Sequence, residues 1–199
     1  YFGFSFHDDF AVFKQILNGY DAWEFCQIQY NYMDVEYQAG RKGLQEAAQK
    51  GLGVVIMEPL RGGQLAQNPP PAAVAQVFAQ SSRNWTPAEW ALQWLWNQRE
   101  VSLVLSGMSA PQQVEENLAS TERSGVGSLT PADLKIIEQV RNVRQGLAPI
   151  PCTHCEYCMP CPNGVAIPDI FGLYNDAMMY GTPEHSRYTY RNFFNPENK

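Results

Sequence analysis

The chain has 199 residues, 45% of them hydrophobic, and a formal net charge of -6. This length and composition allow one or two domains with a packed core. The sequence contains neither a Lys/Arg cluster that could neutralise phosphates nor an apolar run approaching the roughly 20 residues of a membrane span, so nucleic-acid and membrane partners are not expected. The chain does not begin with Met, and its first residues already read as a strand, so we expect it to be cut from a longer protein.

Strands and helices alternate along the predicted fold, because short apolar runs are followed by stretches with apolar residues at helical spacing. In chain order the expected elements are strand 1–7, helix 8–19, strand 23–33, helix 41–51, strand 53–60, helix 86–98, strand 101–108, and helices 110–121 and 130–146. Apolar strands joined by helices predict an α/β fold with a parallel sheet. The pattern itself leaves open a doubly wound sheet or a barrel, and about 145 residues with four units correspond to about half of an eight-unit barrel.

Local signals mark element boundaries. Helix 86–98 begins with Thr86 as N-cap, Pro87 at the first position and Glu89 at the capping-box position. Residues 61–71 are predicted to form a loop from their Gly and Pro content. A second region, rich in Pro and Cys, begins near Ala148, with one helix expected around 168–180.

Four of the five cysteines lie within ten positions of this second region. They are Cys152, Cys155, Cys158 and Cys161, followed by Pro162. Two-residue gaps allow successive thiolates to turn towards one centre, and the closing Cys-Pro belongs to the bacterial ferredoxin signature. The spacing therefore predicts an iron–sulfur cluster, and His154 within the segment is interpreted as a spacer.

Other interpretations of this segment stay open. A structural zinc site is one, although zinc motifs usually come as two separated pairs, and strained disulfides are another. The ferredoxin signature usually has a last gap of three residues, and its fourth cysteine can ligate a second cluster, so the role of Cys161 is undecided. An odd, clustered set of cysteines favours a reducing, cytoplasmic compartment over a secreted disulfide scaffold.

The ends of the predicted strands are candidates for a ligand site, because barrels bind ligands at the carboxyl ends of their strands. This rule selects Ser5, Phe6, His7, Gln27, Gln29, Asn31, Met57, Glu58, the loop 59–63, Ser106, Gly107 and Met108. In the loop, Gly62 and Gly63 permit close backbone approach and Arg61 suits a phosphate, although a simple flexible turn is the competing interpretation. His7 is interpreted as a rim histidine rather than an acid or base.

Several segments together resemble the aldo/keto reductase family, in its branch with an appended 4Fe-4S ferredoxin-type domain. The resemblance is carried by GFSFH, FCQIQYNYMD, YQAGRKGL, GLGVVIMEPLRGGQLA, TPAEWALQWLW, VLSGMSAPQQVEEN and CTHCEYCMPCPNGVAIP. It implies that residues 1–147 form strands five to eight of a TIM (β/α)8 barrel. It also implies that residues 148–199 form a small, mostly helical iron–sulfur domain.

The resemblance further implies a nicotinamide cofactor, NADPH or NADH, lying across the strand ends. Residues in matching positions are Ser5 and Gln27 at the carboxamide, Met57 beneath the nicotinamide, Leu60, Arg61, Gly62 and Gly63 over the pyrophosphate, Gly107 and Met108 in a phosphate turn, and Gln113, Glu116 and Asn117 at the adenosine. The sequence departs from the family pattern at Phe6, Met57 and Gln113. Gln113 stands where an arginine often binds the 2′-phosphate, so both cofactors stay open.

The family's catalytic tetrad of Asp, Tyr, Lys and His lies on strands one to four, so no residue of this chain is assigned a catalytic role. The fragment alone is expected to be inactive. The intact enzyme is expected to move hydride between nicotinamide and a small-molecule carbonyl-type substrate, with an electron-transfer partner as a further option for the cluster. The alternative is a non-catalytic electron-transfer or metal-binding module.

Overall fold

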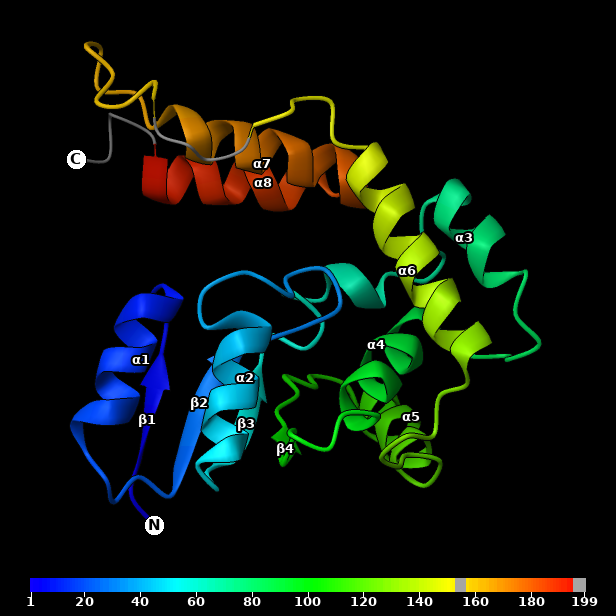
Figure 1. Cartoon of the computed structure of the whole chain (residues 1–199). Coiled ribbons are helices and arrows are strands. Elements are labelled where there is room, and N and C mark those ends of the chain that lie inside the picture. Colours follow the sequence, from blue (N-terminus) through cyan, green and yellow to red (C-terminus); the bar gives the residue numbers. More distant parts are fainter. Residues whose placement is uncertain (153–156, 195–199) are drawn as a thin grey trace. The chain divides into compact units, whose positions relative to one another are not determined.

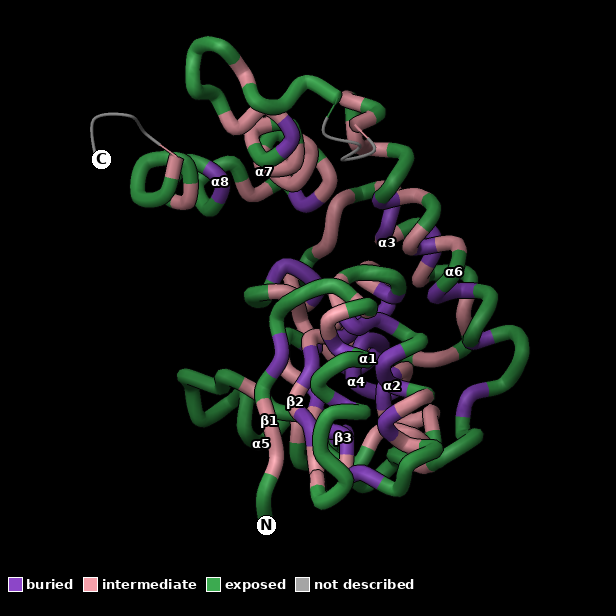
Figure 2. Tube along the Cα trace, turned by 60° about the vertical axis from the view of Figure 1, so that its left-hand side comes forward, coloured by how far each residue is buried: buried purple, intermediate pink, exposed green. Residues whose placement is uncertain are grey.

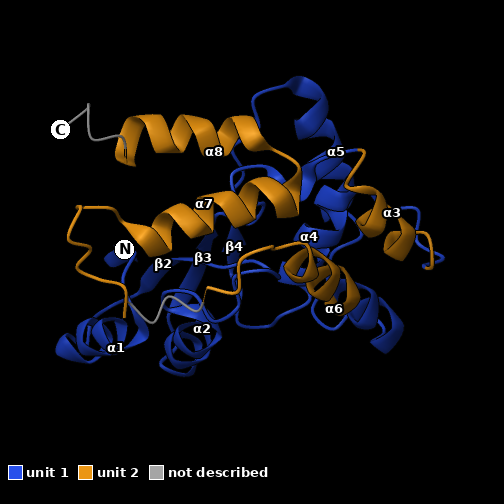
Figure 3. Cartoon of the chain, turned by 90° about the horizontal axis from the view of Figure 1, so that it is seen from above, with its two compact units in different colours: residues 1–68, 81–137 blue, residues 69–80, 138–199 orange. Residues whose placement is uncertain are grey.

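The computed structural model describes residues 1–152 and 157–194. These residues divide into two compact units (Figure 3). The first unit comprises residues 1–68 and 81–137, and the second comprises residues 69–80 and 138–199, including the residues that are not described. The predicted division into residues 1–147 and 148–199 stays a prediction.

A four-stranded sheet runs through the first unit (Figure 1). Its strands are β1 (Gly3–Phe6), β2 (Phe25–Gln29), β3 (Gly53–Met57) and β4 (Leu103–Val104). All neighbouring strands are parallel and their order is β1-β2-β3-β4, which confirms the predicted parallel α/β sheet. A doubly wound sheet would reverse this order at a switch point, so the observed order favours barrel-type winding.

One face of the sheet carries the hydrophobic core of the first unit. Cys26 and Ile28 on β2 and Val54 and Ile56 on β3 are fully buried. They form one cluster with apolar side chains of helices α1 (Phe10–Gly19) and α2 (Gly40–Gln49), namely Phe13, Leu17, Leu44 and Ala47. Figure 2 colours stretches of β2 and β3 as buried. Because side chains alternate across a strand, Gln27, Gln29 and Met57 belong to the opposite, half-buried face.

The remaining helices of the first unit follow β3 and β4. They are a short 3-10 helix (Gln64–Ala66), α4 (Pro87–Trp96) and α5 (Pro111–Thr121), while α6 (Pro131–Gly146) continues from the first unit into the second. The Oγ1 atom of Thr86 accepts a hydrogen bond from the Glu89 amide, which confirms the predicted cap of α4. The Glu89 carboxylate accepts from Arg123 at 2.7 Å, so the predicted return bond of the capping box is replaced by an ion pair.

The described part of the second unit is helical. It contains α3 (Ala72–Phe78), the last turns of α6, α7 (Ile167–Tyr180), α8 (Pro183–Thr189) and a π-helix (Tyr190–Phe194). The Arg144 guanidinium is buried over the Tyr180 ring at 5.0 Å, and it donates to the Met179 carbonyl. These contacts join the end of α6 to the end of α7.

The structure corrects the expected elements in two places. The last strand was expected over 101–108, whereas β4 has only the two residues Leu103 and Val104, which pair with Val55 and Ile56 of β3. The sequence analysis also missed α3, α8 and the π-helix. None of the described helices is long and apolar enough to cross a membrane.

Candidate functional site

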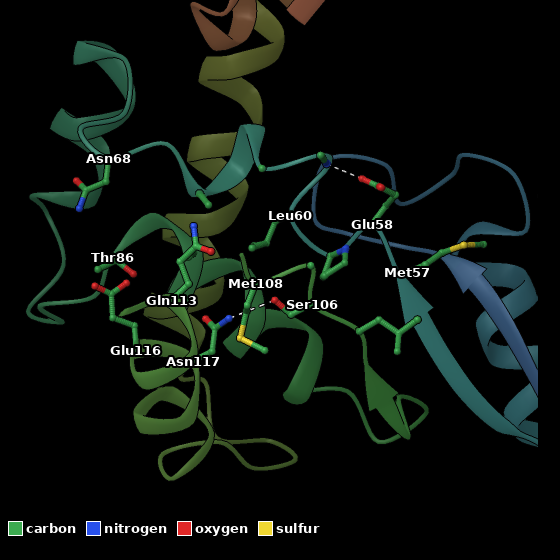
Figure 4. Close-up of a pocket in the computed structure, with 17 residues that line it drawn as sticks. Met57, Glu58, Leu60, Asn68, Thr86, Ser106, Met108, Gln113, Glu116 and Asn117 are labelled. Atoms are coloured by element: carbon green, nitrogen blue, oxygen red, sulfur yellow. Dashed lines mark hydrogen bonds between the residues drawn. The ribbon is translucent and has the colours of Figure 1, made fainter. Parts of the chain in front are cut away.

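A cavity of about 540 Å³ lies at the carboxyl ends of β3 and β4 (Figure 4). Four segments contribute to it: the end of β3 with the loop after it, which reaches Asn68, the start of α4, the segment that follows β4, and the first turns of α5. These are segments from consecutive strand–helix units, and they meet at the edge where parallel sheets bind ligands. All of the residues that line the cavity belong to the first unit.

Most of the predicted cofactor-binding residues line this cavity. From the β3 end and its loop come Met57, Leu60, Gly62 and Gly63. From the segment after β4 come Gly107 and Met108, and from α5 come Gln113, Glu116 and Asn117. The cavity thus brings together residues that lie up to 60 positions apart in the chain. Their role in binding a cofactor stays a prediction.

The loop after β3 bends sharply because several of its residues adopt left-handed backbone conformations. Glu58 and Arg61 have φ values of 54° and 50°, and Gly62 and Gly63 have values of 60° and 86°. The Glu58 carboxylate accepts a hydrogen bond from the Gly62 amide across the bend. Two glycines in succession relieve the steric cost that a Cβ would carry here, and they leave the backbone open towards the cavity.

A buried amide holds this loop against the loop after β2. Asn31, which is 1% exposed, donates from Nδ2 to the Glu58 carbonyl and to Asp34 Oδ2, both at 3.0 Å. Its Oδ1 atom accepts from the amides of Met33 and Asp34. Asp34 Oδ2 also accepts from Arg61 Nε at 3.1 Å. We call Asn31, Asp34 and Arg61 the Asn31 clamp, since together they tie the two loops to each other.

The clamp changes the position expected for Arg61. The sequence analysis placed its guanidinium on a phosphate, but this side chain does not line the cavity and instead contacts Asp34 and Gln64. Asp34 was not selected from the sequence at all. The spacing of Asn31 and Asp34, in which an amide oxygen accepts from the backbone two and three residues on, is the Asx-turn signal that could have indicated it.

Ser5 and Gln27 lie beside the cavity rather than in its lining. They are paired in register on β1 and β2. Gln27 Nε2 lies 3.5 Å from the sulfur of Met57, which does line the cavity. Gln27 on β2 is therefore next to a residue of the cavity lining, and Ser5 on β1 lies one strand further away.

The start of α5 is organised by side chains that also line the cavity. Gln113 Oε1 accepts from the amides of Ser109 at 2.8 Å and Ala110 at 3.2 Å, and so caps a helix whose N-cap residue is alanine. Asn117 Nδ2 donates to Ser106 Oγ at 3.2 Å, a contact drawn in Figure 4. These bonds hold the segment after β4 against α5.

Asn68 and Thr86 also line the cavity, although the sequence analysis did not assign them to a site (Figure 4). Thr86 was identified only as a helix cap, a role it fills. Asn68 lies before three prolines, in a segment read as a loop without a ligand signal. Its proximity to the cavity depends on tertiary packing that no local pattern indicates.

The remaining cysteine, Cys26, is fully buried in the core of the first unit. Burial raises the pKa of its thiol to about 12. A thiol that stays protonated and inaccessible is neither a nucleophile nor a metal ligand. It packs as a small hydrophobic residue of the core.

Three of the four clustered cysteines belong to the part of the chain that the structure describes. Cys152, Cys158 and Cys161 are free of disulfides, and Cys158 is exposed. Cys155, with His154, lies outside the described residues. Over residues 1–152 and 157–194, no three His, Cys, Asp or Glu side chains come together in a group that could hold a metal ion. Because one of the four predicted ligands lies outside the described residues, the metal site stays a prediction.

Comparison with known proteins places this geometry in a family. The sequence model described as the Aldo/keto reductase family matches residues 1–142. The L-galactose dehydrogenase of Arabidopsis thaliana is 34% identical over 109 residues, which cover 47% of this chain and 34% of that protein.

Solved structures show the same fold. An aldo-keto reductase from Bacillus halodurans matches with a TM-score of 0.54 in both its holo and apo forms, at 20% identity, over 70% of this chain and 49% or 50% of those chains. At this identity the likeness concerns the fold, which is that of TIM-barrel relatives with a parallel sheet. The chain spans about a third of the curated relative and about half of the solved ones.

Proposed function

This chain belongs to the aldo/keto reductase family, and we propose that it supplies the nicotinamide-dinucleotide site of an oxidoreductase acting on a small carbonyl-type substrate. The observation that carries the proposal is the cavity at the ends of β3 and β4, lined by the Gly62–Gly63 bend and the start of α5. Cofactors of α/β enzymes bind at this edge of the sheet.

The residues present fit such a cofactor. A pyrophosphate needs close approach of the backbone, and Gly62 and Gly63 offer a bend without side chains. Figure 4 shows Met57 and Glu116 at opposite ends of the cavity, as a long ligand requires. We assign Met57, with Gln27 and Ser5 beside it, to the nicotinamide end. We assign Gln113, Glu116 and Asn117 to the adenosine end.

The residues of this chain bind and orient the dinucleotide, which would supply or accept the hydride when bound. We assign to the Gln27 amide, which contacts Met57, the role of binding the carboxamide and so fixing which face of the ring is presented. The Asn31 clamp holds the bend over the cavity. Hydride transfer depends on such positioning, because small displacements of reacting atoms carry large rate penalties.

For the second region we propose a 4Fe-4S cluster bound by Cys152, Cys155, Cys158 and Cys161, in a domain over residues 148–199. The support is the spacing of the cysteines and the lack of disulfides at the three described ones. We route no step of the hydride reaction through this group. A cluster and unpaired thiols both suit a reducing compartment such as the cytoplasm.

Titration of the chain with NADH and NADPH tests the dinucleotide proposal. Saturable enhancement of the reduced-nicotinamide fluorescence is expected. Gly63→Val should weaken binding by about tenfold or more, because a branched side chain would stand in the bend that meets the pyrophosphate. Gly127→Val is the matched control, since Gly127 also has a positive φ of 69° and open space around it but does not line the cavity. Equal losses in both variants, or no saturation with either nucleotide, would contradict the proposal.

A further inference from the structure

The electrostatic character of the cavity distinguishes between the two nicotinamide cofactors. Among the described residues that line it, the ionisable side chains are two carboxylates, Glu58 and Glu116, and there is no Lys, Arg or His. Glu116 is exposed on α5, at the adenosine end of the proposed site. A 2′-phosphate, which adds about 1.5 to 2 negative charges near neutral pH, would enter this part of the cavity without a cation to meet it.

The arginine nearest in sequence to the bend is already engaged. Arg61 Nε lies 3.1 Å from Asp34 Oδ2, and the two side chains are 24% and 14% exposed. Its Nη1 atom donates to Gln64 Oε1 at 3.4 Å. A guanidinium paired in this way would have to leave a half-buried carboxylate in order to reach a phosphate, and it belongs to the pyrophosphate loop rather than to α5.

The start of α5 offers few spare donors for an added anion. The amides of Ser109 and Ala110 already donate to Gln113 Oε1. The side-chain amide of Gln112 donates to Glu116 Oε1 at 2.7 Å. A neutral glutamine that caps its own helix and a carboxylate fixed by its neighbour suit a hydroxyl group, which can donate, better than a phosphate, which can only accept near neutral pH.

We propose that this site selects NADH over NADPH, with Glu116 and Gln113 as the residues that determine the preference. The inference rests on the proposed dinucleotide site. Each unfavourable contact between a carboxylate and the added phosphate is screened at an exposed position, so the discrimination is moderate. We expect NADPH to bind about tenfold more weakly than NADH, which corresponds to about 1.4 kcal/mol.

The test measures the dissociation constants of NADH and NADPH for the full chain by fluorescence titration at low and high salt. Glu116→Gln should lower the ratio of the NADPH to the NADH dissociation constant several-fold. Gln113→Arg should lower this ratio or bring it below one, because it adds a cation. Glu115→Gln removes the same charge from the same exposed helix, but Glu115 does not line the cavity, so this control should leave the ratio unchanged. In the unmodified chain the ratio should also shrink at high salt, because screening weakens exposed charges.

The outcomes separate the inference from its premise. Saturable binding with NADPH equal to or tighter than NADH overturns the cofactor preference and leaves the dinucleotide site standing. The residue assignment is overturned if the chain prefers NADH and this preference is unchanged in Glu116→Gln, in Gln113→Arg and at high salt. If neither nucleotide saturates the folded chain, checked by circular dichroism, the proposed function falls and takes this inference with it.

Discussion

The bend after β3 and the cysteine segment differ in how far the chain itself shapes them. The bend is held by hydrogen bonds from the Asn31 clamp, and a cavity lies beside it. The three described cysteines form no metal-ligand group. The cysteine spacing is nevertheless the stronger sequence signal of the two.

The difference has a physical cause. A cavity for a dinucleotide arises from packing and hydrogen bonding that the chain completes alone. Several thiolates gathered at one point repel each other, and the metal supplies the free energy that holds them, about 10 to 16 kcal/mol for structural zinc in small domains. A cysteine motif therefore indicates the ligand that a segment binds, whereas the shape of a cavity depends on the packing of the chain itself.

The largest expected effect concerns the cysteine segment. Cys158→Ala should abolish the 4Fe-4S cluster, because only three of its four cysteine ligands would remain. Iron and acid-labile sulfide in anaerobically purified protein should then fall to background. The helical circular dichroism of the second unit should fall with them. Metal analysis and visible absorbance make the measurement.

Cys26→Ala is the matched control for this change. It also removes one thiol, but from the fully buried core of the first unit, and should leave the iron content unchanged. Stoichiometric zinc in place of iron in the unmodified protein would contradict the iron–sulfur assignment and favour the zinc alternative. An iron and sulfide content in Cys158→Ala equal to that of the unmodified protein would contradict the assignment of Cys158 as a cluster ligand.

The next largest effect concerns the bend after β3, because hydrogen bonds within the chain hold it. Asn31→Ala removes four hydrogen bonds from a buried position and leaves the Glu58 carbonyl and two amides with fewer partners. We expect a loss of about 2 to 3 kcal/mol in the free energy of unfolding of the first unit, measured with urea. Dinucleotide binding should weaken in parallel, as the bend loses its support.

Asn68→Ala provides the comparison for this variant. Asn68 lines the same cavity but is exposed, and its truncation should change stability by no more than about 0.5 kcal/mol. Equal destabilisation by both variants would mean that the bend is not held by the Asn31 clamp, and the contrast with the cysteine segment would lose its basis.

Features of the fold that depend on residues close together in the sequence could be predicted, whereas features that depend on distant residues could not. The apolar runs that contain Cys26 and Ile28, or Val54 and Ile56, are local, and the structure confirms a strand in each. The Thr86 cap is local too. The extent of β4 depends on how much of β3 it can pair with, and the pairing of Asp34 with Arg61 joins residues 27 positions apart, so neither is encoded in a short pattern.

The candidate site divides in the same way. Gly62 and Gly63 were selected because their residue type permits a bend, and the structure brings them to the cavity. Arg61 was selected because its charge suits phosphate, and the structure turns it to a carboxylate. A backbone requirement restricts a position to few conformations, whereas a long charged side chain takes whichever partner the tertiary fold provides, and the sequence does not fix that choice.

The smallest predicted effect concerns Cys26, the cysteine outside the segment 152–161. Burial raises the pKa of Cys26 from 9.0 to about 12, so the unfolded thiol ionises several pH units before the folded one. The stability that comes from keeping this thiol protonated in the folded chain is fully present below about pH 9. It is lost as the pH rises towards 12. Between about pH 8 and pH 10 the free energy of unfolding should fall by about 1.4 kcal/mol more in the unmodified chain than in Cys26→Ala. Urea unfolding under reducing conditions makes the measurement. Parallel loss in both proteins would show that this thiol meets solvent when the chain is folded, and the contrast between a core cysteine and the exposed Cys158 would then fail.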